Sequence, residues 1–166
     1  PEKGLEDAVA VAAALNDHLL VWGFIEDQDY ASNVEASAPT GTIKWRGFLP
    51  TEHFQRDLKK CRAFLNTPKW NEAYGNVVVE AMACGVPVVA YDRGGPGELI
   101  HSGVSGWLVE PDDVNAMILA TKRVEEIDRR VCRSWVEQSA SHDGFAMRVE
   151  AWIKEGLNLS NPSNFA

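Results

Sequence analysis

Two glutamates spaced eight positions apart, Glu72 and Glu80, are the side chains in this sequence best suited to chemistry. Gly75 lies between them, and glycine lets a backbone approach a ligand closely and adopt positive φ. We predict a helix from Asn76, whose first N–H groups lack intrahelical partners and suit a phosphate. Glu80 would lie in the second turn, where its carboxylate can accept hydrogen bonds from two hydroxyls. The pattern is typical of a site for a polyhydroxylated, phosphorylated ligand.

The residues after Asn76 indicate where this helix ends and how it packs. The three valines at 77–79 favour a strand when taken alone, but the stretch at 80–84 favours a helix. Gly85 suits the left-handed position that closes a helix, and Pro87 prevents its continuation. We expect this helix to be mostly buried. An ionised Glu80 on it would therefore need polar partners.

Composition limits the classes of protein to consider. The chain has 166 residues, of which 45% are hydrophobic, and a formal net charge of −8. This length fits one domain with a real core. The negative charge argues against nucleic acid as a partner, and no apolar run approaches the roughly 20 residues of a transmembrane helix. Three scattered cysteines indicate reduced thiols in a cytosolic protein, and no Cys/His spacing predicts a metal site.

Apolar runs and helical stripes alternate along the chain, which predicts a parallel, doubly wound α/β sheet with helices on both faces. Thr51 is the expected N-cap of one helix, and Trp135 and Trp152 lie on stripes expected to face the core. Ligands bind at the carboxyl ends of such strands. Lys3 would follow a strand end only if a strand preceded Pro1. The predicted strands lie at 19–24, 42–46, 63–66, 87–91 and 107–109, and the helices at 5–15, 27–36, from 51, from 76, from 96, and in pieces from 112 to 157.

Four segments in order resemble the C-terminal, donor-binding domain of retaining glycosyltransferases of family 4, which have the GT-B fold. They are the E-x7-E stretch at 72–98, Pro1-Glu2-Lys3-Gly4, Gly47-Phe48-Leu49-Pro50, and the stretch at 106–113. The resemblance implies a Rossmann-like, three-layer parallel sheet with helices on both faces. Residues 1–157 would form the nucleotide-sugar domain, with its first strand missing, and residues 158–166 a polar tail.

The resemblance also implies an activity and a site. The parent enzyme would transfer a hexose, by our expectation glucose from UDP-glucose, with retention at the anomeric carbon. Glu72 and Lys3 would be the catalytic residues, with Glu72 on the donor sugar, Lys3 on the diphosphate and Glu80 on the ribose. No tightly bound cofactor and no metal are expected. The full donor site implied is Lys3, Gly47, Phe48, Leu49, Glu72, Ala73, Tyr74, Gly75, Asn76, Val77 and Glu80.

The acceptor, a small molecule, lipid or glycan, would bind mainly to an N-terminal domain absent from this chain, which alone would be inactive. The enzyme would be cytoplasmic, or peripheral at a membrane through that domain. Residues 70–80 resemble bacterial enzymes that glucosylate pteridines such as tetrahydrobiopterin. Trp70 could be a sugar platform or a packing residue, and core packing would explain Phe48 and Leu49 equally well. Two alternatives are a nucleotide-sugar epimerase on the same fold and a non-catalytic nucleotide-sugar-binding module.

Overall fold

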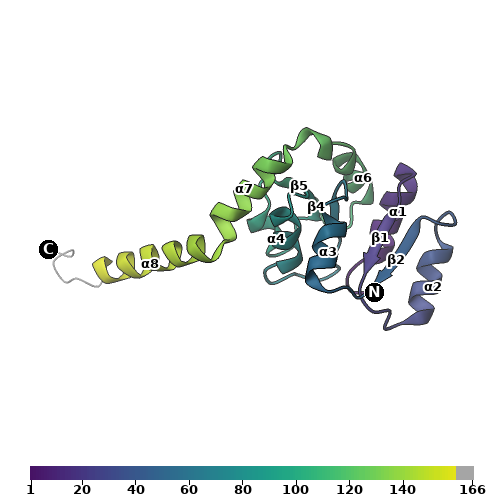
Figure 1. Ribbon diagram of the computed structural model, residues 1–166, viewed down its shortest axis with the longest axis horizontal. Coiled ribbons are helices and arrows are strands. Elements are labelled where there is room, and N and C mark those ends of the chain that lie inside the picture. Colours follow the sequence, from purple (N-terminus) through teal and green to yellow (C-terminus); the bar gives the residue numbers. More distant parts are fainter. Residues whose placement is uncertain (160–166) are drawn as a thin grey trace.

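The computed structural model describes residues 1–159, in which five strands alternate with helices (Figure 1). The strands are β1 (Leu19–Trp22), β2 (Ile43–Gly47), β3 (Phe64–Asn66), β4 (Val88–Tyr91) and β5 (Gly106–Val109). The helices are α1 (Leu5–Leu15), α2 (Gln28–Ala36), α3 (Thr51–Leu58), α4 (Asn76–Ala83), α5 (Pro96–Leu99), α6 (Val114–Lys122), the 3₁₀ turn η1 (Val124–Glu126), α7 (Arg129–Ala140) and α8 (His142–Leu159).

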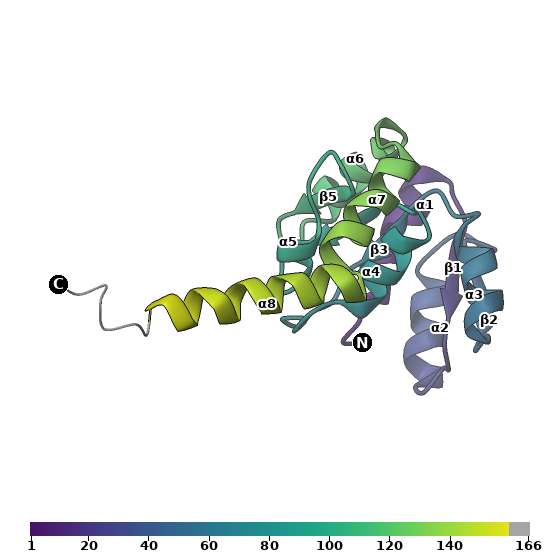
Figure 2. The same ribbon diagram turned by 60° about the vertical axis from the view of Figure 1, so that its left-hand side comes forward.

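All strand pairs are parallel, as predicted, but the strands form two sheets. β1 pairs with β2, and β4 lies between β3 and β5. In the three-stranded sheet Val88 is opposite both Phe64 and Gly106. In Figure 2 the pair β1–β2, with α2, stands apart from the sheet built around β4. The parallel α/β class is therefore confirmed, whereas a single continuous sheet is not what the described residues form.

The core lies on both faces of β4, whose four residues are completely buried. Val88 and Ala90 pack into one apolar cluster with α4 and α7, and Val89 and Tyr91 pack into another with α1 and α6. A strand covered on both faces is apolar throughout, because side chains pointing each way are removed from water. Helices thus cover both faces of the sheet, as the sequence predicted.

Helix ends follow the sequence signals in most places. Asp27 and Asp113 cap α2 and α6 by accepting hydrogen bonds from Tyr30 and Ala116 N–H, both at 2.8 Å. Gly85 has φ 70° just after α4, as predicted for the residue that closes this helix. The prediction that Thr51 caps α3 is wrong. Pro50 occupies the N-cap, and its ring has no oxygen that could accept a hydrogen bond, so no side chain caps that end.

The last helix, α8, extends away from the rest of the molecule (Figure 1). Trp152 on α8 is 73% exposed, so the prediction that it is a core residue is wrong. Because α8 extends away from the domain (Figure 1), the indole ring lies in solvent. Trp135 on α7 is half-buried and donates a hydrogen bond to Leu99 O at 3.1 Å.

The predicted polar tail, 158–166, begins inside a helix rather than after one. Residues 158 and 159 belong to α8, and residues 160–166 lie outside the described part of the chain. Across residues 1–159, no helix combines the length and the apolar character needed to cross a bilayer.

Candidate functional site

The structure brings two predicted site residues into contact. Lys3 Nζ lies 3.3 Å from Glu72 Oε2, although 69 positions separate them. Trp70 Nε1 donates to the same carboxylate oxygen at 3.2 Å, and Lys3 Nζ lies 4.6 Å from the centroid of the Trp70 ring. Glu72 is largely covered, with 19% of its side chain exposed, whereas 71% of Lys3 is exposed. Trp70 therefore belongs to this charged cluster, and its role as a sugar platform stays a prediction.

The backbone around Lys3 explains why it reaches Glu72. Gly4 has φ 63°, and a Cβ at this position would lie 1.9 Å from Thr67 O. Only glycine permits this approach. The Thr67 hydroxyl donates to Gly4 O at 2.9 Å, and Lys69 N–H donates to Glu2 O at 2.8 Å. The first residues of the chain are thus fixed against the segment that follows β3.

Two glycines fix the loop that carries Glu72 against the end of β4. Gly95 N–H donates to Glu72 O at 2.7 Å. A Cβ on Gly94 would lie 2.3 Å from Glu72 O, and one on Gly95 would lie 2.3 Å from Tyr74 O. The Gly94-Gly95 pair is therefore a packing requirement, because any side chain here would push the Glu72 loop outward.

The start of α4 presents unpaired donors beside this loop. Gly75 is the N-cap with φ 96°, and its carbonyl accepts from Val78 N–H at 2.9 Å. Within residues 1–159, the N–H groups of Gly75, Asn76 and Val77 have no hydrogen-bond acceptor. Such groups at the positive end of a helix favour an anion. Ala73, Tyr74, Asn76 and Val77 are exposed, with Tyr74 at 47% and Val77 at 44%.

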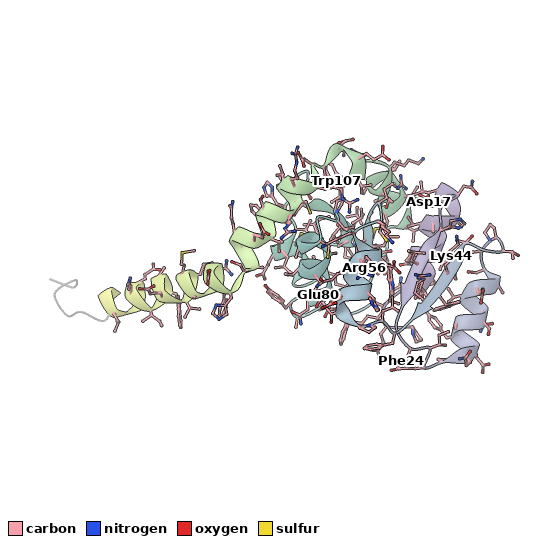
Figure 3. The ribbon with its side chains drawn as sticks, viewed as in Figure 1. Asp17, Phe24, Lys44, Arg56, Glu80 and Trp107 are labelled. Carbon is pink, nitrogen blue, oxygen red and sulfur yellow. The ribbon has the colours of Figure 1, made fainter. Side chains whose placement is uncertain are left out.

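Glu80 has surroundings different from those expected. It lies on α4 with an exposed side chain, labelled in Figure 3. Its carboxylate forms no hydrogen bond or ion pair with the described residues. The buried face of α4 is formed by Val78, Ala81 and Met82. Helical geometry turns position 80 away from that face. The expectation that Glu80 lies in buried surroundings is therefore wrong, and its carboxylate is accessible to a ligand.

The other sheet contributes an aromatic pair. Phe24 and Phe48 stack with centroids 5.3 Å apart and planes 6° apart, and they are 78% and 68% exposed. Each follows the carboxyl end of its strand, β1 or β2, and Gly23 N–H donates to Gly47 O at 3.0 Å to join the two ends. Phe24 is labelled in Figure 3. The sequence analysis placed Phe24 at the end of a strand and missed it as a site residue. Its signal was an aromatic next to a glycine immediately after a buried apolar run.

The described residues show no direct contact between the Lys3–Glu72 cluster and the Phe24–Phe48 pair, but one groove is lined by a member of each, Lys3 and Phe24. This groove has a volume of about 1400 Å³, and its walls include Lys3, Val77 and Phe24. Leu49 turns partly inward, toward a separate hollow of about 310 Å³ beside Arg46. Among the described residues, Lys3 and Val77 are the predicted site residues that line the larger groove, together with Phe24.

A polar network fixes the segment before Glu72. Asp7, 9% exposed, accepts hydrogen bonds from Lys69 Nζ at 2.5 Å and from the Tyr91 hydroxyl at 2.6 Å. Lys69 also contacts Asp112, which pairs with Arg93 at 2.5 Å. Burial lowers the pKa of Lys69, but the hydrogen bonds to the two carboxylates outweigh it and raise that pKa overall. Sequence reasoning missed this network because its members are far apart in the chain.

Known proteins resemble this chain in sequence and in fold. Residues 1–142 match the sequence model of a family described as glycosyl transferases group 1. A relative from Rhodococcus erythropolis, D-inositol 3-phosphate glycosyltransferase, is 28% identical over 145 residues. That match covers 80% of this chain and 33% of the relative, so the chain spans about a third of the relative's length.

Two solved structures superpose on most of the chain. One is the lipopolysaccharide outer core galactosyltransferase WaaB in its apo form, with a TM-score of 0.80, 20% identity, and coverage of 93% of this chain and 46% of WaaB. The other is HepE of Anabaena in complex with UDP, with a TM-score of 0.72, 23% identity, and coverage of 95% and 46%. At these identities the likeness shows the fold.

Proposed function

Because this chain belongs to the group 1 glycosyl transferases and has the fold of one half of a GT-B glycosyltransferase, we propose that residues 1–157 bind the nucleotide-sugar donor. The reaction we propose is the transfer of a hexose, glucose from UDP-glucose, with retention, as in family 4. The observation that carries the proposal is the convergence of Lys3, Glu72 and the unpaired N–H groups at the start of α4. A structure of similar fold that binds UDP-glucose supports the choice of donor.

In this proposal each group has a separate part of the donor to hold. Lys3 and the N–H groups of Asn76 and Val77 bind the diphosphate and stabilise its charge as it leaves. Glu72 accepts hydrogen bonds from the sugar hydroxyls, and Glu80 accepts them from the ribose. The bond between the anomeric carbon and the phosphate oxygen breaks while the acceptor oxygen bonds to the same face of that carbon. The acceptor's proton passes to the leaving phosphate.

The ion pair between Lys3 and Glu72 has a role before the donor arrives. With no ligand present, each residue neutralises the other at 3.3 Å. A bound diphosphate attracts the ammonium more strongly than one carboxylate does, because it carries more charge. Lys3 therefore moves to the phosphate, and Glu72 becomes free to accept hydrogen bonds from the sugar. Binding of the two halves of the donor is coupled through this exchange.

The aromatic pair completes the donor site at its far end. We place the nucleobase beside Phe48, whose ring and that of Phe24 offer an exposed flat surface on which a base can stack. The acceptor belongs to a second domain of the enzyme, so this chain alone binds donor without transferring it. The acceptor we propose is a pteridine, from the resemblance of residues 70–80.

Calorimetric titration of the chain with UDP, GDP, ADP and their glucose or mannose conjugates tests the donor. We expect UDP and UDP-glucose to bind selectively. Lys3→Met should weaken both about tenfold, in the range of one charged hydrogen bond. Glu72→Gln releases Lys3, so UDP should bind at least as tightly as before, while the advantage of UDP-glucose over UDP falls about tenfold. Glu80→Gln should weaken both ligands about equally.

Glu125→Gln provides the matched control, since Glu125 is an exposed carboxylate on η1 that should leave every affinity unchanged. Equal losses from Glu72→Gln for UDP and UDP-glucose would refute the division of roles between Lys3 and Glu72. Absence of binding by every nucleotide would refute the donor site on this chain. Incubation of the complete enzyme with UDP-glucose and a pteridine then tests transfer, and formation of an epimerised nucleotide sugar would refute it.

A further inference from the structure

The indole of Trp70 contacts both charged residues of the proposed donor site. Its Nε1–H donates to Glu72 Oε2 at 3.2 Å, and the Lys3 ammonium lies 4.6 Å from the centroid of its ring. Lys3 Nζ donates to the same Oε2 at 3.3 Å. Within residues 1–159, the other carboxylate oxygen, Oε1, accepts no hydrogen bond. The two donors thus share one oxygen of Glu72 and leave the other available.

These two donors respond differently to an incoming anion. Lys3 is charged and flexible, and 71% of its side chain is exposed, so a bound diphosphate attracts it. The indole N–H of Trp70 carries no formal charge and can only donate a hydrogen bond. A diphosphate therefore draws Lys3 away from Glu72 and leaves the contact with Trp70 in place. With Lys3 withdrawn, the indole is the remaining described side chain that orients this carboxylate.

The segment immediately before the indole is fixed by contacts to three other parts of the chain. Arg93, which follows β4, donates from Nη1 to Pro68 O at 2.8 Å, and the Pro68 side chain is buried. Lys69 Nζ donates to Asp7 on α1 and to Asp112 in the loop before α6. The polar network around Lys69 therefore holds the backbone from which the indole extends.

The backbone of Glu72 is fixed as well, so the indole adds control of the side chain. Glu72 O accepts from Gly95 N–H, and Glu72 forms a short parallel bridge with Gly94. A glutamate fixed only at its backbone keeps its rotatable side-chain bonds, and ordering them when a ligand binds costs entropy. The hydrogen bond from Trp70 removes much of that freedom in advance. Oε1 is then presented to a ligand in one orientation.

We propose that Trp70 is a positioning residue that fixes Glu72 for the donor sugar and so raises selectivity for a nucleotide sugar over the free nucleotide. It holds Oε2 while Oε1 accepts a hydrogen bond from a sugar hydroxyl. The inference rests on the proposed function, because it takes the sugar to bind at Glu72. It gives the indole a role through Glu72 that differs from a surface on which the sugar stacks.

The test measures UDP and UDP-glucose affinity by calorimetry for the original chain, Trp70→Phe, Glu72→Ala and the combined variant. Phenylalanine keeps an aromatic face for Lys3 but lacks the N–H. Trp70→Phe should leave UDP affinity within about twofold and reduce the advantage of UDP-glucose over UDP about fivefold, the effect of one hydrogen bond. In the Glu72→Ala background it should not change this advantage further, because the group that it positions is absent.

Trp152→Phe is the matched control, since Trp152 is an exposed tryptophan on α8, and it should change neither affinity. The indole resonance gives an independent readout. The signal lost in Trp70→Phe identifies the Trp70 Nε1–H in the proton–nitrogen spectrum. In the original chain this proton should exchange slowly with solvent before and after UDP-glucose is added, because it stays hydrogen-bonded. Faster exchange with UDP-glucose bound would overturn the inference.

The affinities separate failure of the inference from failure of the proposed function. If the original chain prefers UDP-glucose and Trp70→Phe keeps that preference, the inference alone is overturned. Equal losses for UDP and UDP-glucose would overturn it too, because Trp70 would then only support the fold. A further loss in the Glu72→Ala background would also overturn it and would indicate direct contact between indole and sugar. An original chain that does not bind UDP, or does not prefer UDP-glucose, would refute the proposed function and this inference with it.

Discussion

β4 and β1 are both apolar, parallel strands of four residues, yet the structure treats them differently. β4 pairs on both edges and all of its side chains are completely buried. β1 pairs on one edge, and each of its residues is half-buried. Apolar composition therefore predicts a strand, but the number of its neighbours decides how much that strand contributes to stability.

The same contrast predicts that the two regions differ in their resistance to local unfolding. Around β4, two apolar clusters meet on opposite faces of one sheet. Around β1–β2, a smaller cluster centred on Val9, Val34 and Ile43 lies on one side, and only Trp22 of β1 packs against a cluster of the β4 region. Local opening is easiest where few apolar contacts and few ladder hydrogen bonds must be broken. We expect the β1–β2 region to exchange its amide hydrogens faster than β4.

Glycine substitution should give the largest difference between the two regions. A Cβ on Gly106 would lie 2.0 Å from Val88 O, inside the β4–β5 pairing, whereas a Cβ on Gly41 meets nothing within 4 Å. Gly106→Ala should cost about 4 kcal/mol of unfolding free energy or prevent folding. Gly41→Ala should cost only about 1–2 kcal/mol, from its φ of 86°. Urea denaturation of both variants measures this, and similar costs would contradict the contrast.

Truncating one valine in each strand compares how much buried packing in β4 and in β1 contributes to the unfolding free energy. Val89 is completely buried in β4, and Val21 is half-buried in β1. Val89→Ala should cost about 2–3 kcal/mol, from lost transfer free energy and the cavity left behind. Val21→Ala should cost about 1 kcal/mol or less. Chemical denaturation with circular dichroism measures both, and an equal or larger cost at Val21 would show that β1 is as well packed as β4.

Alkaline pH should weaken the β4 region through a buried thiol. Cys132 on α7 is completely buried, and burial raises its pKa to about 11. The folded state thus keeps this thiol neutral, so its contribution is full below the ordinary pKa of about 9 and is lost as pH rises toward 11. We expect unfolding free energy to fall by about 2 kcal/mol between pH 9 and 11 from this group.

Cys132→Ala isolates that contribution, because its stability should fall less steeply over the same pH range. Cys61→Ala is the comparison variant, since burial also raises the pKa of Cys61 but this residue is only partly buried. Thermal or urea unfolding under reducing conditions measures the slopes. Identical slopes for Cys132→Ala and the original chain would contradict the assignment.

The smallest effect should come from the ion pair that links the two regions. Arg62, before β3, and Asp17, before β1, lie 2.5 Å apart, with 38% and 51% of their side chains exposed. An exposed pair contributes about 0.5 kcal/mol and is screened by salt. Asp17→Asn should therefore reduce unfolding free energy by about that amount at low salt and by nothing measurable in 1 M NaCl. A loss above about 1.5 kcal/mol would mean that the two regions are coupled tightly at this end.

Local sequence signals predicted much of this architecture. Gly85 ended its helix as expected, and the apolar run before Tyr91 formed the buried central strand. Lys3 and Glu72 were predicted for one site and lie in contact, while their roles remain predictions. Local patterns failed where distant segments decide the outcome. Lys69 donates a hydrogen bond to Asp7, which lies 62 positions away in the sequence, and no local pattern indicates that pair.

Orientation within a predicted element was the second source of error. Glu80 was placed on the right helix, but its exposure depends on which face of α4 meets the sheet. Phe24 was assigned to a predicted strand, but β1 ends two residues earlier, at Trp22. For that reason the sequence analysis did not predict that its ring is exposed. Periodicity identifies an apolar face, but only the packing of neighbouring elements shows whether that face is covered, as Trp152 illustrates.

Because the indole of Trp152 is exposed, its fluorescence can report on the surroundings of α8. The chain has six tryptophans, and Trp152 is 73% exposed on a helix that extends from the domain. An indole in water emits at longer wavelength than one packed against apolar side chains. With the other five tryptophans replaced by phenylalanine, the emission maximum would report directly whether any surface covers this helix. Fluorescence from one side chain would thus follow α8 separately from the folding of the domain behind it.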